Sequence, residues 1–135
     1  MGYTAIVLEE KDQNRLKVRL GKNLEFPDWD VKCHHCTLHM GLPTVEEDEV
    51  YDNSFILVVD AIGISDKAVA FRVKSIVHPR GVEIRSSNDI PYITLLVNSR
   101  DGGRAVDSNA ITNWFPINDE EEECMRYMGR LKFIE

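Results

Sequence analysis

The stretch that decides the fold runs from Val31 to Gly41 and reads VKCHHCTLHMG. It holds three of the four histidines and two of the three cysteines of the chain. Its mostly apolar run ends at the Gly41-Leu42-Pro43 break, which predicts a buried strand over Cys33–Met40. Side chains of a strand alternate between its two faces. The expected faces are Cys33, His35, Thr37 and His39 on one side, and His34, Cys36, Leu38 and Met40 on the other.

His35 and Thr37 therefore share a face at a spacing of two residues. An imidazole transfers protons near neutral pH, and a hydroxyl can hold a phosphate oxygen. This pair predicts an anion site on that face of the strand.

Length and composition limit the class of protein. A chain of 135 residues with 43% hydrophobic and 29% charged residues fits one globular domain over residues 1–135. No apolar run approaches the ~20 residues of a membrane span, and Met1–Glu10 predicts a first strand rather than a signal peptide. The odd cysteine count favours a reducing compartment over a disulfide framework, so we expect a cytoplasmic protein.

The net charge of −7 is concentrated in two acidic segments, Glu46–Glu49 and Asp119–Glu123. An acidic chain is a poor partner for long nucleic acid, because that affinity depends on neutralising phosphates. A small phosphodiester or an RNA end needs only a local site and remains compatible with this charge. We expect no membrane partner and no cofactor, and the oligomeric state is left open.

Periodicity and breakers predict an α+β fold with about seven strands, a mostly antiparallel sheet and one main helix after the first strand. The expected strands are residues 3–8, 33–40, 54–64, 68–77, 82–85, 90–98 and 128–134, with a helix over 9–20 that ends at Gly21. Residues 24–30, 43–49, 86–89 and 99–109 are expected to be loops, and 110–114 a short helical turn or a strand entry.

At His35-Cys36-Thr37-Leu38 the chain resembles the two-histidine phosphoesterases, which carry a His-x-Thr-hydrophobic motif on each of two central strands. The matching second segment is Pro91–Val97, where Thr94 stands at the threonine position and Tyr92 at the position of the second histidine. The Gly102–Trp114 segment is similar to the region after the second motif in small, phage-type, RNA-repair-like members. The resemblance spans roughly residues 3 to 117.

The resemblance implies a sheet with a central cleft and a metal-independent phosphodiesterase acting on an RNA 2′,3′-cyclic phosphate end or a cyclic nucleotide. In such enzymes two histidines take and give a proton, and two threonines hold the non-bridging oxygens. Carried over by position, His35 would be an acid–base residue, and Thr37 and Thr94 would bind phosphate. For a phage-encoded member, the compartment would be the host cytoplasm.

Tyr92 leaves three interpretations open. It could act as the acid with His35 as the base, since a tyrosine with a pKa of ~10 is a poor base but can donate a proton. His39 or His34 could supply the missing function. Alternatively, the chain could be a catalytically silent module that binds and sequesters a nucleotide without turning it over.

Other residues could contact such a ligand. The candidates are the cations Arg72, Arg100 and Arg104, the ring of His39, and Tyr3 and Trp114 as platforms on which a base could stack.

Alternatives from other classes remain. Cys33 and Cys36 have the spacing of a zinc knuckle, but adjacent ligands in a strand point to opposite faces and no second pair comes after them, so we expect no metal site. A cysteine nucleophile has no local signature. The two acidic segments could instead make this an interaction protein that meets a basic partner.

Overall fold

A computed structural model describes residues 2–21, 28–117 and 125–135 of the chain. Nine strands form one sheet, together with two α-helices and two short 3-10 helices in the described residues. The strands are β1 (Tyr3–Leu8), β2 (Asp30–Val31), β3 (His35–Met40), β4 (Ser54–Ile64), β5 (Ala68–Val77), β6 (Glu83–Ile84), β7 (Tyr92–Val97), β8 (Trp114–Pro116) and β9 (Arg126–Ile134). The helices are α1 (Glu10–Gly21), α2 (Val45–Glu49), η1 (Ser99–Asp101) and η2 (Ala105–Ala110).

The sheet is antiparallel throughout and runs in the order β2-β7-β5-β4-β9-β1-β3, with β6 added to β5 and β8 added to β4. The long hairpin of β4 and β5 forms its centre, and its turn comes after Ile64, where the Ser65 hydroxyl accepts hydrogen bonds from the Lys67 and Ala68 amides. The α+β class and the antiparallel sheet that the sequence predicts are therefore confirmed.

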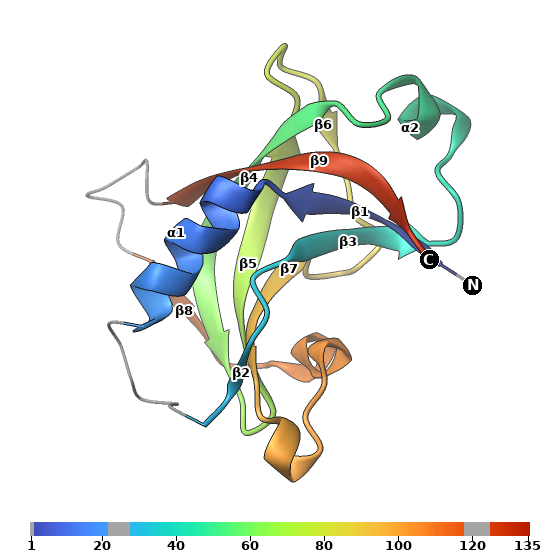
Figure 1. The fold of residues 1–135 in the computed structure, drawn as a ribbon. Coiled ribbons are helices and arrows are strands. Elements are labelled where there is room, and N and C mark those ends of the chain that lie inside the picture. Colours follow the sequence, from blue (N-terminus) through green and yellow to red (C-terminus); the bar gives the residue numbers. More distant parts are fainter. Residues whose placement is uncertain (1, 22–27, 118–124) are drawn as a thin grey trace.

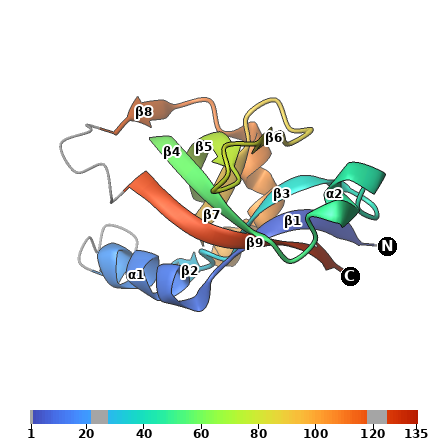
Figure 2. The same ribbon diagram turned by 90° about the horizontal axis from the view of Figure 1, so that it is seen from above.

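One continuous segment, Asp30–Met40, joins the two ends of this sheet. Its first part bonds to β7, where the Lys32 and Cys33 amides donate to the carbonyls of Leu95 and Thr94 at 2.8 and 3.0 Å. Its second part is β3, which pairs with β1. The sheet consequently curls round on itself, as Figures 1 and 2 show, and β3 comes to lie near β7.

The segment changes its pairing partner from β7 to β1 just after Cys33. The Cys33 φ of 52° lies in the left-handed region that few residues other than glycine adopt. The predicted strand over Cys33–Met40 therefore begins only at His35, and the expected alternation is wrong for Cys33. Its side chain is fully buried in the core together with Cys36, not on the face of His35.

The core fills the inside of the curled sheet. Phe55, Leu57 and Tyr127 are at most 1% exposed, and Leu16 of α1 packs into the same cluster. The Asp12 carboxylate of α1 accepts a hydrogen bond from the Met128 amide at 2.5 Å, which ties the helix to β9.

Three expected loops contain regular structure. Residues 43–49 contain α2, whose Thr44 cap and Glu47 side chain form a reciprocal capping box. Residues 99–109 contain η1 and most of η2. Residues 24–30 contain β2 at Asp30, and the rest of that prediction falls largely on residues 22–27, which lie outside the described residues.

The strands predicted over 82–85 and 90–98 are shorter in the structure, where they span Glu83–Ile84 and Tyr92–Val97, and the segment 110–114 leads into β8. β4, expected to be buried on both faces, alternates between buried and half-buried residues.

Candidate functional site

A cavity of about 510 Å³ lies between β3 and β7, and we call it the central cavity. Both motif segments line it: β3 contributes His35 and Thr37, and β7 contributes Tyr92 and Thr94. The other lining residues are Tyr3, His39, Met40, Ser87, Asn88, Ala105, Val106 and Asn109. The curl of the sheet is what places these two strands across one space.

His35 stands beside Tyr3, with the two ring centroids 5.2 Å apart. Its Nδ1 lies 3.0 Å from Nδ1 of His34, so one of the two imidazoles donates to the other. Burial, and to a lesser degree the neighbouring His34, lowers the pKa of His35 to about 4. At neutral pH the imidazole is therefore uncharged and has a lone pair to accept a proton.

Tyr92 faces the same cavity from β7. Burial, reinforced by Cys36, raises the pKa of the Tyr92 phenol above its ordinary value. The phenol is consequently protonated at neutral pH and can donate. His35 and Tyr92 thus hold different protonation states, which is the condition for a base and an acid to work as a pair.

The two threonines differ in what their hydroxyls do. The Thr94 hydroxyl lies 2.9 Å from the Ser108 hydroxyl and donates to the Ala105 carbonyl at 3.3 Å, so it fastens η2 to β7. Only 7% of Thr94 is exposed. Thr37 is half-buried, and within the described residues its hydroxyl has no hydrogen-bond partner. Thr37 is therefore the freer of the two to meet a ligand.

His39 lines the cavity, but both of its ring nitrogens are occupied. Nε2–H donates to Oε1 of Glu47 at 2.6 Å, and Nδ1–H donates to the Met40 carbonyl at 2.9 Å. Because both partners are acceptors, these contacts favour the doubly protonated ring. The hydrogen bond to Glu47, with that to Met40, raises the pKa of His39 accordingly. His39 thus joins the end of β3 to α2.

The acidic segment Glu46–Glu49 is exposed for the most part, as expected of a solvated face, but Glu47 is half-buried. Burial pushes the pKa of its carboxyl up, yet the hydrogen bonds from His39 and from the Thr44 amide outweigh burial and hold that pKa below its usual range. The second acidic segment, Asp119–Glu123, lies outside the described residues.

The three arginines that were predicted to contact a ligand do not line the central cavity. The Arg72 guanidinium forms a two-point ion pair with Asp60, at 2.8 and 3.2 Å. Arg100 lies 3.5 Å from the carboxylate of Asp28. Arg104 is exposed and precedes η2, where its amide donates to Asp107. The described residues that line the central cavity include no lysine or arginine.

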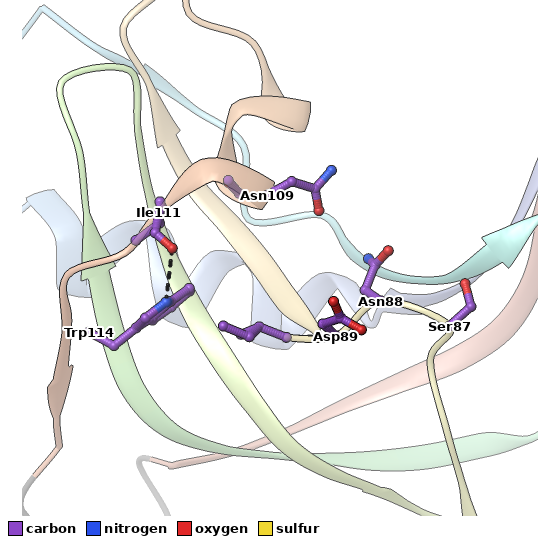
Figure 3. A pocket seen from close by; sticks show the side chains of 8 residues that line it. Ser87, Asn88, Asp89, Asn109, Ile111 and Trp114 are labelled. Atoms are coloured by element: carbon purple, nitrogen blue, oxygen red, sulfur yellow. Dashed lines mark hydrogen bonds between the residues drawn. The ribbon is translucent and has the colours of Figure 1, made fainter.

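Trp114 lines a neighbouring recess of about 460 Å³, which we call the Trp114 recess (Figure 3). Ser87, Asn88 and Asn109 line both spaces, so the recess and the central cavity adjoin. Sequence reasoning missed the two asparagines. Asn88 and Asn109 lie in the polar segments that precede and follow Pro91–Val97, and this position is the one feature of the sequence that indicates them.

Cys33 and Cys36 are buried, and burial raises the pKa of each of these two thiols to about 12. Their sulfurs face backbone carbonyls, that of Leu95 for Cys33 and that of Thr37 for Cys36. Within the described part of the chain, no three His, Cys, Asp or Glu side chains gather closely enough to hold a metal ion. The helices in that part include none that is long and apolar enough to cross a membrane.

Comparisons of the chain with protein-family models, with curated proteins and with solved structures gave no match.

Proposed function

We propose that the central cavity binds a small phosphodiester, and that His35 acts as the base and Tyr92 as the acid in its cleavage. The observation that carries the proposal is the placement of His35 and Thr37 on β3 and of Tyr92 and Thr94 on β7 around one cavity. Its volume of about 510 Å³ falls in the range of small-molecule sites, and its wall combines aromatic rings with a few hydroxyl and amide groups.

The protonation states support this division of roles. For a 2′,3′-cyclic phosphate, neutral His35 would take the proton of a water molecule as its oxygen attacks phosphorus. The bond from phosphorus to one ribose oxygen would break, and that oxygen would take the phenolic proton of Tyr92. The products are a phosphomonoester and a free ribose hydroxyl, after which His35 and Tyr92 exchange protons with water. The free hydroxyl of Thr37 would donate to a phosphate oxygen.

When the His39 ring is protonated, the Glu47 carboxylate lies 2.6 Å from it, so this pair adds little net charge at the edge of the cavity. Since both its ring nitrogens are engaged by Met40 and Glu47, we expect His39 to hold the end of β3 in place rather than to donate a proton to a phosphate.

The test is turnover of a panel of 2′,3′-cyclic nucleotides, cyclic-phosphate-ended RNA and cyclic dinucleotides by the purified protein in the presence of a chelator. We expect a phosphomonoester product whose formation is lost in His35→Ala and Tyr92→Phe. His78→Ala is the matched control, because His78 lies in the turn after β5 and does not line the cavity. Equal turnover in His35→Ala and the wild type would refute the proposal.

A second candidate is a binding module that sequesters its ligand intact. Two observations favour it: the Thr94 hydroxyl is already engaged by Ser108, and the described lining holds no lysine or arginine to stabilise a transition state. Retention of an intact ligand by the wild type, lost in Thr37→Val but with no product formed, would support this function instead.

A further inference from the structure

We propose that the Trp114 recess is a guanine-binding subsite, so that the ligand of this protein is a dinucleotide or larger with its phosphodiester in the central cavity. The inference rests on the proposed function, because it extends that ligand by one nucleoside. It concerns a space that the two motif strands do not form.

The recess has the walls that a flat heterocycle requires. Trp114, Ile90 and Ile111 supply an aromatic and aliphatic side, and its volume is about 460 Å³. Base stacking on aromatic side chains is a common source of affinity for single-stranded nucleotides.

The indole of Trp114 is held in place before any ligand arrives. Its Nε1–H donates to the Ile111 carbonyl at 3.2 Å. β8 pairs Trp114 with Gly63 of β4, and a Cβ at Gly63 would lie 2.6 Å from two carbons of the indole ring. The ring therefore packs directly on the β4 backbone, and little conformational entropy remains to be lost when a base binds.

Polar groups occupy the other side of the recess. Figure 3 shows the head groups of Asn88, Asp89 and Asn109 across the space from Trp114 and Ile111. The described residues offer these three side chains no hydrogen-bond or ion-pair partner. Within this part of the chain, Asn88 is bonded only through its backbone N–H, which donates to the Ser86 hydroxyl. They are therefore available to a ligand.

The carboxylate selects the base. The carboxylate oxygens of Asp89 accept hydrogen bonds, and they can accept two side by side. Guanine presents two adjacent donors, N1–H and N2–H, on its Watson–Crick edge, whereas adenine, cytosine and uracil do not. An asparagine amide beside the carboxylate can donate to guanine O6. The chemistry of the recess therefore fits guanine better than the other bases.

Three residues are shared by the walls of the Trp114 recess and the central cavity. Ser87, Asn88 and Asn109 border both the recess and the central cavity, so a base in one and a phosphodiester in the other can belong to the same molecule. The two spaces together exceed what a single cyclic mononucleotide would fill.

The experiment measures binding of three deoxydinucleotides by calorimetry: dGpG, dApA and dIpI, in which hypoxanthine lacks the guanine 2-amino group. These probes have no 2′-hydroxyl to attack the phosphodiester, and chromatography after each titration checks that water has not cleaved them. We expect wild-type protein to bind dGpG at least tenfold more tightly than dApA or dIpI. Asp89→Asn should lower the dGpG affinity about tenfold and leave that of dApA within twofold. Asp66→Asn is the matched control, an exposed aspartate in the β4–β5 turn that lines neither space.

The two proposals fail in different ways. Equal affinities for the three probes, or an unchanged dGpG affinity in Asp89→Asn, would overturn the guanine subsite while the function of the central cavity stands. Failure of every probe to bind would overturn the guanine subsite, and if the cyclic nucleotides are not turned over either, the proposed function is overturned as well. Asp89 is exposed and has no partner among the described residues, so its substitution should not disturb folding.

Discussion

Removal of the Thr94 hydroxyl, as in Thr94→Val, should lower the free energy of unfolding by about 1–3 kcal/mol. The hydroxyls of Thr94 and Ser108 lie 2.9 Å apart, and Ser108 is only 2% exposed. Valine keeps the shape of threonine but leaves the Ser108 hydroxyl and the Ala105 carbonyl without this partner. A buried polar group left unpaired costs about 1–3 kcal/mol, more than the net contribution of a typical hydrogen bond.

The assay is urea unfolding of Thr94→Val, Ser108→Ala and the double variant. Removing both partners should cost little more than removing one, so we expect a coupling energy of about 1 kcal/mol or more between the two positions. Effects that simply add, within about 0.5 kcal/mol, would refute the view that Thr94 serves to fasten η2. The same variants report on function, because only a phosphate-binding Thr94 would make Thr94→Val, but not Ser108→Ala, weaken ligand binding.

Three further perturbations test other parts of the site. Because burial lowers the pKa of His35 to about 4, against about 6.5 in the unfolded chain, the unfolded state binds the proton more tightly. The free energy of unfolding should therefore fall by up to about 3 kcal/mol as the pH drops from 6.5 to 4. His35→Asn should remove this part of the pH dependence in urea unfolding. Identical curves of stability against pH for the variant and the wild type would contradict this assignment to His35. Glu47→Gln should lower the pKa of His39 towards its ordinary value, as followed by NMR titration of the ring, whereas an unchanged pKa would mean that Glu47 does not hold the charge. Gly63→Ala would place a Cβ 2.6 Å from the Trp114 ring, so a loss of about 1–3 kcal/mol is expected in thermal unfolding, and an unchanged Tm would show that β8 can move away freely.

The long strands were predictable because alternation is a local property of the sequence. β4, β5 and β9 lie close to their expected bounds, and the helix after β1 was found from its apolar spacing and terminal glycine. α2 was missed because its acidic run was interpreted as a solvated loop. The signal was present, however, since Thr44 and Glu47 stand at the spacing of a capping box.

The arrangement of the site needed tertiary information. The unusual φ of Cys33, which moves the chain from β7 to β1, depends on what surrounds it rather than on its residue type. Arg72 was expected at a ligand, but the β4–β5 register brings it to Asp60 instead. Spacing could place His35 and Thr37 on one face. It could not show that the Thr94 hydroxyl would be engaged by a residue 14 positions later.

The position of β9 bears on how the protein is made. β9 lies between β4 and β1 and pairs with both, so residues 126–134 complete the middle of the sheet. While the ribosome is still adding the preceding residues, β1 and β4 each present an open edge to other nascent chains. Pairings over such a long stretch of chain also form slowly. We therefore expect the pairing that connects β1 to the β4–β5 hairpin to form only after residues 126–134 have emerged from the ribosome.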